Sequence, residues 1–166
     1  MIKNYRPMTE FTHLDEKNKS RMVDVTGKEP TLREAYAQGI VLMTPATAEA
    51  IEAGDMAKGD VFGVAKIAGI MAAKRTSDLI PMCHPLELTG IDIDFSIDST
   101  RGEITIQARV RTFGRTGVEM EALTAVSAAA LTVYDMCKSA DKAMVLSDIK
   151  LLEKRGGKSG TFKREP

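Results

Sequence analysis

The chain has 166 residues, of which 43% are hydrophobic and 28% charged, and these values fit one globular domain and exclude a disordered polypeptide. Its 23 basic and 23 acidic residues cancel, so net charge gives no reason to expect a nucleic acid or an anionic membrane as partner. The first residues lack the apolar core of a signal peptide, and the longest apolar window, Val61–Ala73, contains Lys66 and is too short to cross a bilayer. We therefore expect a cytoplasmic protein.

The N-terminal part of the chain contains an irregular arm followed by two short elements. Residues 1–27 are polar and charged, and we expect a partly flexible arm whose one apolar stretch, RMVDV at 21–25, forms a short strand. Residues 31–38 predict a short helix, because Thr31 can cap it, a glutamate follows at the capping-box spacing and a glycine follows its last residue. Residues 40–43 predict a short buried strand.

Two helices with clear start signals come next. The first is predicted over 45–53, with Thr44 as its N-cap, a proline at its first position and Gly54 at its end. The second begins after Asp60 and extends over 61–75. Its predicted core stripe consists of Val61, Val64, Ala65, Ala68, Met71 and Ala72. The small residues in this helix favour close packing against a neighbouring element.

The second half of the chain predicts a hairpin, a long helix and a last strand. Residues 90–98 and 103–113 alternate apolar and polar side chains on either side of a turn, which predicts a β-hairpin with one buried face. Residues 116–141 predict the longest helix, and 143–154 predict a strand with a bulge near Ser147. The core stripe of the helix consists of Leu123, Val126, Ala130, Val133 and Cys137.

The order of these elements predicts the fold. Strand, helices, strand, strand, helix and strand follow the split βαβ pattern. We therefore expect an α+β, ferredoxin-like domain over residues 28–154, with an antiparallel sheet and helices packed on one face. Residues 155–166 form a Gly- and Lys-rich tail, whose GGKSG segment lacks the spacing of a phosphate-binding P-loop.

The segment LIPMCHP at 79–85 carries adjacent Cys83 and His84, while the remaining histidine and cysteine are His13 and Cys137. These four residues lack the short-spaced pairs of zinc sites, so a metal site is disfavoured. Neighbouring side chains on an extended segment point to opposite sides, which also disfavours a nucleophile–base pair. The two prolines stiffen the segment, and His84 is then either a structural residue or a ligand-binding group.

Charged residues mark both ends of the long helix. Asp135 and Lys138 share a face at i,i+3 spacing, as an ordinary surface ion pair or as functional groups. Glu119 and Glu121 lie in the first turn, where the helix dipole by itself favours carboxylates. Because Glu121 and Asp135 are fourteen residues apart, about 21 Å separates them along the helix axis. One small ligand cannot contact both within one chain, so a site that uses both requires two chains.

Several segments together resemble a known family. They are KGDVF, AAKRTSDLIPMCHPLELT, TGVEMEALTA, ALTVYDMCK and LLEKRGGKSGTF. In this order they resemble the molybdenum cofactor biosynthesis protein C family, the cyclic pyranopterin monophosphate synthases. The resemblance extends from MVDV to the C-terminal tail, and Arg115 stands where some relatives have lysine. It implies a ferredoxin-like subunit of a homohexamer, a trimer of dimers, with active sites at subunit interfaces.

The resemblance also implies a reaction and a set of residues. The expected enzyme is a phosphorus–oxygen lyase that converts 3′,8-cyclo-7,8-dihydroguanosine 5′-triphosphate, made by a radical S-adenosylmethionine enzyme, into cyclic pyranopterin monophosphate and pyrophosphate. Asp135 is the implied general acid or base, with Lys138 beside it and Lys58 as a further catalytic amine. The implied substrate-binding residues are Met82, Cys83, His84, Glu119, Met120, Glu121 and Lys154. No carboxylate cluster demands a metal, so we expect no required cofactor and leave a role for Mg²⁺ open.

A hypothesis from another class competes with this one. A non-catalytic ferredoxin-like module that binds a nucleotide as a regulator also explains the fold and the lysines. Only the enzyme explains the Asp135–Lys138 pair together with a histidine in a rigid corner. The enzyme turns its ligand over and the regulatory module does not, which separates the two hypotheses by experiment.

Overall fold

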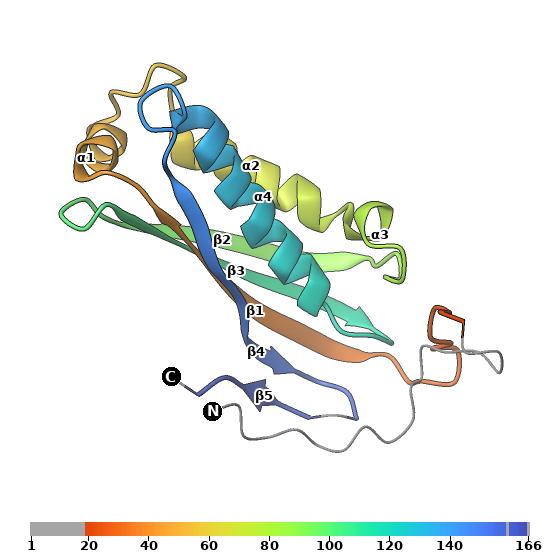
Figure 1. The fold of residues 1–166 in the computed structure, drawn as a ribbon. Coiled ribbons are helices and arrows are strands. Elements are labelled where there is room, and N and C mark those ends of the chain that lie inside the picture. Colours follow the sequence, from red (N-terminus) through yellow and green to blue (C-terminus); the bar gives the residue numbers. More distant parts are fainter. Residues whose placement is uncertain (1–18, 159, 166) are drawn as a thin grey trace.

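The computed structural model describes residues 19–158 and 160–165. In chain order its elements are β1 (Thr31–Leu42), α1 (Pro45–Ala53), α2 (Val61–Ala73), α3 (Thr76–Leu79), β2 (Leu88–Asp98), β3 (Glu103–Gly114), α4 (Glu119–Cys137), β4 (Val145–Arg155) and β5 (Phe162–Lys163). The strands form one antiparallel sheet in the order β2-β3-β1-β4-β5, and α2 and α4 lie side by side on one of its faces (Figure 1). This arrangement confirms the predicted ferredoxin-like α+β fold.

Strand β1 occupies the segment of the helix predicted over 31–38, so that prediction is wrong. The strand predicted over 40–43 is confirmed over residues 40–42, as the end of this longer strand. Alternate residues of β1, such as Ala35 and Ala37, are fully buried, and β3 and β4 pair with its two edges. The local sequence also suits a helix, but the hydrogen bonds to two neighbouring strands outweigh that preference. Residues 21–25 form no strand either.

Helix α4 lies so close to the sheet and to α2 that two glycines have no room for a side chain. A Cβ atom on Gly39 of β1 would lie 2.6 Å from Cγ1 of Val126 in α4. A Cβ atom on Gly69 of α2 would lie 2.6 Å from Cδ1 of Ile93 and 2.9 Å from the carbonyl oxygen of Ala125. Since these distances are shorter than van der Waals contacts, the glycines permit the observed packing of the helix layer.

The predicted limits of the first two helices are confirmed at their caps. The hydroxyl of Thr44 accepts a hydrogen bond from the amide of Thr47 at the start of α1, and Gly54 ends this helix with φ at +78°. The carboxylate of Asp60 accepts a hydrogen bond of 2.9 Å from the amide of Gly63 at the start of α2. Gly54 and Asp60 therefore mark the two ends of the loop that joins α1 to α2.

The predicted core stripe of α2 is correct in part. Val61 and Ala65 are buried, but Val64 and Met71 are exposed to solvent. The buried positions recur every four residues and most of them carry small side chains, which permits close packing against α4, while Val64 and Met71 lie on the outer side. Together with the exposed Ile67, they give α2 an apolar outer face.

The later elements agree with the sequence. The β2–β3 hairpin buries Ile93 and Ile104 under the helices, and the predicted stripe of α4 includes the fully buried Val126 and Val133. The register of β4 against β1 shifts beside Ser147, where the next residue has a φ of +49°, and this confirms the predicted bulge. The two-residue strand β5 pairs with β4 within the segment that the sequence marks as a tail.

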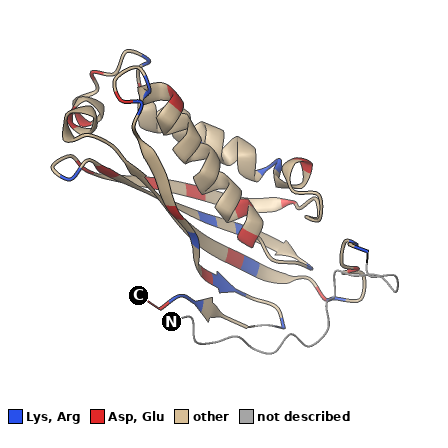
Figure 2. Cartoon of the chain, viewed as in Figure 1, with Lys and Arg blue, Asp and Glu red and all other residues tan. Residues whose placement is uncertain are grey.

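The charged residues of α4 lie at its two ends. Figure 2 shows acidic residues near both ends of α4 and none along its middle, which the sequence of the helix explains. Within residues 19–158 and 160–165, no helix combines the length and the hydropathy needed to cross a bilayer.

Candidate active site

The predicted site residues form two groups, one at each end of helix α4. Helices α2 and α4 run in opposite directions across the sheet (Figure 1). The loop before α2 therefore meets the C-terminal end of α4, where Lys58, Asp135 and Lys138 form the helix-end cluster. The segment after α3 meets the N-terminal end of α4 and surrounds a cavity, the helix-start pocket.

In the helix-end cluster, one carboxylate accepts hydrogen bonds from two lysines. Lys58 Nζ lies 2.7 Å from Oδ2 of Asp135 and 2.8 Å from its carbonyl oxygen. Lys138 Nζ lies 2.6 Å from Oδ1 of the same residue. Lys58 reaches this position from a turn in which Gly59 has a φ of +85°, a conformation that favours glycine. The carboxylate and both ammonium groups remain open to solvent.

The lysines set the protonation state of this cluster. Hydrogen bonds from Lys138, and then from Lys58, lower the pKa of Asp135 to about 2. The same carboxylate raises the pKa of Lys138. Asp135 is therefore ionised near neutral pH, and the ammonium group of Lys138 keeps its proton. Before Asp135 can act as a general acid, its bonds to the lysines must weaken.

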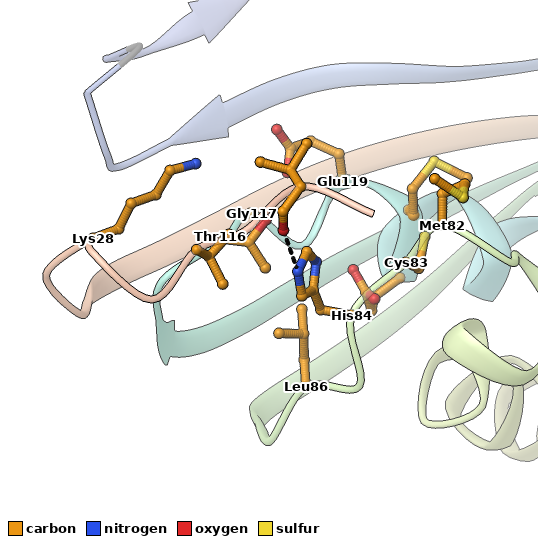
Figure 3. Close-up of a pocket in the computed structure, with 12 residues that line it drawn as sticks. Lys28, Met82, Cys83, His84, Leu86, Thr116, Gly117 and Glu119 are labelled. Atoms are coloured by element: carbon orange, nitrogen blue, oxygen red, sulfur yellow. Dashed lines mark hydrogen bonds between the residues drawn. The ribbon is translucent and has the colours of Figure 1, made fainter. Parts of the chain in front are cut away.

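The helix-start pocket has a volume of about 390 Å³ (Figure 3). Six of the seven predicted substrate-binding residues line it: Met82, Cys83, His84, Glu119, Met120 and Glu121. Lys154, the seventh, lies beside it, because its Nζ is 3.0 Å from Oε1 of Glu119. The volume falls in the range of small-molecule sites.

Glu121 points into the protein and is only 4% exposed, whereas Asp135 at the other end of the helix is open to solvent. Burial raises its pKa to about 7, and the nearby Glu119 adds to this effect. Burial and the charge of Glu121 also raise the pKa of the Cys83 thiol. The thiol therefore stays protonated and is a poor nucleophile, whereas Glu121 can exchange a proton near neutral pH.

A second recess of about 210 Å³ adjoins the helix-start pocket and shares Lys28, Thr116, Gly117 and Glu119 with it. Its cationic lining residues are Lys28, Arg33, Arg115, Lys154 and Arg155. A single carboxylate, that of Glu119, lies among them. This cationic recess can bind a multiply charged anion.

Sequence reasoning missed Lys28 and Arg33 as members of the site. They approach the other cationic residues only through strand pairing, since β1 lies between β3 and β4 and Thr31 faces Gly114 in the register. The guanidinium of Arg33 donates hydrogen bonds to the carbonyls of Gly114 and Arg115. No local motif marks either residue, and the correct sheet register is the signal that would have found them.

The cysteine and histidine side chains considered as metal ligands do not converge in the described part of the chain. Cys137 lies in the core at the end of α4, where burial raises its pKa to about 11, while Cys83 lies at the other end beside Glu121. Sixteen residues of helix, about 24 Å, separate Cys137 from Glu121. Residues 19–158 and 160–165 contain no group of three or more His, Cys, Asp or Glu side chains placed to bind a metal ion. His13 lies outside the described residues.

A ferredoxin-like domain with a cationic recess, a buried carboxyl group and an Asp–Lys cluster has the features of an enzyme that acts on a small anionic molecule. Comparison with known proteins agrees, because residues 22–157 match the model of the MoaC family. The chain belongs to this family.

Three relatives are cyclic pyranopterin monophosphate synthases by name. The protein from Heliobacterium modesticaldum is 61% identical over 95% of this chain and 99% of its own. The protein from Pelotomaculum thermopropionicum is 60% identical over 95% of this chain and 93% of its own. The protein from Roseiflexus sp. strain RS-1 is 58% identical over 93% of this chain and 98% of its own. Such identity over whole chains shows that this protein is an enzyme of the same family.

Proposed function

We propose that this protein is a cyclic pyranopterin monophosphate synthase of molybdenum cofactor biosynthesis. It converts 3′,8-cyclo-7,8-dihydroguanosine 5′-triphosphate, the product of a radical S-adenosylmethionine enzyme, into cyclic pyranopterin monophosphate and pyrophosphate, as a phosphorus–oxygen lyase. The observation that carries the proposal is the identity of 58% to 61% with named synthases over almost the whole chain. The reaction takes place in the cytoplasm, where the nucleotide precursor of this substrate is available.

The shape and charge of the two cavities support this substrate. The helix-start pocket offers apolar side chains, such as Met82 and Leu86, to the faces of a heterocycle and the carboxyl groups of Glu119 and Glu121 to its N–H groups. The cationic recess continues from it and suits a triphosphate, because arginine and lysine are the common phosphate ligands. The substrate carries these two parts, a guanine-derived ring system and a triphosphate.

The length of α4 supports an active site shared between two copies. The helix is continuous from Glu119 to Cys137, so the helix-start pocket and Asp135 lie about 21 Å apart within one subunit. A second copy can bring its own helix-end cluster to the pocket. The apolar outer face of α2 and the exposed Leu131 of α4 supply a surface for such an assembly. We propose a homohexamer, a trimer of dimers, with a complete site at each shared interface.

The residues of the shared site account for the chemistry required. Opening and closing the purine ring needs proton transfers at nitrogen and carbon. Lys58 and Lys138 donate protons, and Asp135 orients both ammonium groups and accepts a proton when they withdraw. Lys154 and its neighbours in the cationic recess stabilise the charge that develops as the cyclic phosphate forms and pyrophosphate leaves.

We also propose that the reaction needs no resident metal, because five cationic side chains already surround the predicted phosphate position. Turnover by protein treated with EDTA, with and without added Mg²⁺, tests this point. Retained turnover without Mg²⁺ supports it, and a strict dependence on Mg²⁺ contradicts it.

The central experiment is turnover of 3′,8-cyclo-7,8-dihydroguanosine 5′-triphosphate by the purified protein, measured as pyrophosphate and cyclic pyranopterin monophosphate. Wild-type protein should form both products, and Asp135→Asn should lose the activity while its oligomeric state stays the same. Binding without turnover in the wild type would support the regulatory nucleotide-binding module instead. Near-normal turnover by Asp135→Asn would contradict the assigned chemistry.

A further inference from the structure

A segment of the N-terminal arm forms one wall of the helix-start pocket. Val23 and Val25 line the pocket and are half-buried, whereas Met22 and Asp24 are exposed. This alternation is that of an extended chain, in which successive side chains point to opposite sides. Residues 21–28, the arm wall, therefore present an apolar edge to the cavity although they belong to no strand of the sheet.

The side chain of His84 binds the backbone of the arm wall. Its Nε2 atom lies 2.8 Å from the carbonyl oxygen of Val23 (Figure 3). Because a carbonyl oxygen can only accept, Nε2 must carry the proton in this bond. In the neutral imidazole, Nδ1 is then an acceptor. The rigid LIPMCHP corner thus fixes one N–H donor against the arm.

Among the described residues, the other hydrogen bonds of the arm wall are local. The amide of Lys28 donates to the carbonyl of Val25, and the amide of Thr26 donates to the carboxylate of Asp24. They shape a turn within the wall and do not connect it to a described helix or strand. The bond from His84, by contrast, connects residues that are 61 positions apart in the chain.

We propose that His84 is a positioning residue, which holds the arm wall in place through Val23, and that Val23 and Val25 contact the planar ring of the substrate. The proposal rests on the proposed function and changes the part expected of His84, since the histidine acts through the arm. Val23 and Val25 then add apolar contacts to those that Leu86 and Met82 offer in the same cavity. The arm wall also carries Lys28 into both cavities, so one hydrogen bond positions a ring contact and a cationic group together.

Three substitutions of His84 test the donor itself. His84→Gln places an amide N–H near the position of Nε2, His84→Asn places one near Nδ1, and His84→Phe keeps the ring shape without a donor. Amide hydrogen exchange of residues 22–28 and trypsin cleavage after Arg21 and Lys28 report how often the wall opens. Both are measured on the intact protein without substrate.

We expect Asn and Phe at this position to raise exchange and cleavage about tenfold, the effect of losing one hydrogen bond, and Gln to retain most of the protection. Unchanged protection in the Asn and Phe variants would overturn the proposal. Equal loss of protection in all three variants would overturn it as well, because the position of the donor would then not matter.

The ring contact has its own test. Val25→Ala should raise KM for the substrate several-fold with a smaller change in kcat, and Met22→Ala, an exposed neighbour on the same segment, is the matched control. An unchanged KM in Val25→Ala would count against the contact. If the wild type forms no product, the proposed function fails, whereas hydrogen exchange still decides whether His84 holds the wall.

Discussion

The two ends of α4 carry carboxyl groups in opposite states. Asp135 is exposed between two lysines, and its pKa falls to about 2. Glu121 is buried at the other end beside Glu119, and burial raises its pKa to about 7. The same functional group is thus a permanent anion at one end and a proton carrier at the other. The surroundings of each carboxyl group, more than its residue type, define its chemical role.

The largest expected effect concerns whether the two ends act in one site. Asp135→Asn and Glu121→Gln should each lower turnover at least about a hundredfold. After subunit exchange in an equal mixture, about a quarter of the shared sites hold both native residues, so turnover should recover to about a quarter of the wild-type value. Turnover of the mixture is measured against each variant alone. No recovery after confirmed exchange would mean that the two ends do not share a site.

The next effect concerns how the buried Glu121 makes the stability of the fold depend on pH. Between about pH 4.5 and pH 7 the folded protein keeps a proton on Glu121 that the unfolded chain releases, so the free energy of unfolding decreases as pH rises through this window. Glu121→Gln removes this dependence. Above pH 7 the variant should be more stable than the wild type by on the order of 3 kcal/mol.

Denaturant unfolding at pH 4.5 and above pH 7, at one protein concentration, measures this difference. Asp135→Asn serves as the comparison from the other end of the helix, since an exposed carboxylate should not produce a slope in this window. Equal slopes for the wild type and Glu121→Gln would contradict the raised pKa.

At the exposed C-terminal end of α4, the prediction concerns the pKa of Asp135. In the double variant Lys58→Met and Lys138→Met, the pKa of Asp135 should rise from about 2 toward its ordinary value of 3.8, because both hydrogen-bond donors are lost. Carbon NMR titration of the carboxyl group measures it. In the wild type the corresponding stability is present above pH 3.8 and is lost as pH falls toward 2. Lys150→Met, which removes a partner of Asp148, is the control and should leave Asp135 unchanged.

The smallest effect tests the packing between the two ends. Gly69→Ala should lower the free energy of unfolding by about 1 to 3 kcal/mol, because the new Cβ meets the carbonyl oxygen of Ala125 at 2.9 Å. Gly27→Ala, where no atom lies within 4 Å, should stay within about 0.5 kcal/mol of the wild type. Denaturant unfolding of both variants compares them. A stable Gly69→Ala protein would show that α2 can move away from α4.

Much of the fold was predictable because its signals are local. The caps at Thr44 and Asp60, the alternation of the hairpin and the stripe of α4 each depend on neighbouring residues. The error at β1 has a physical cause: alanines and a capping-box spacing suit a helix until two strands pair with the segment. Local sequence does not contain that pairing.

The site also has a part that was predictable from the sequence and a part that was not. The segments that resemble the family supplied Lys58, Asp135, Lys138 and the residues of the helix-start pocket, and the structure gathers them into two groups. Arg33 and the contact between His84 and Val23 were not predictable, because each depends on residues that are distant in the chain and meet only through sheet register or a loop crossing. Tertiary structure supplies this part of the site.

The continuous helix α4 has a consequence for the proposed assembly. If each active site combines the start of one α4 with the end of another, every copy of this helix belongs to two sites. The length of the helix then sets the distance between neighbouring reaction centres. One added turn would change that distance by about 5.4 Å. Its alanine-rich middle carries no charged residue and is buried against the core, which keeps the distance between its two ends constant.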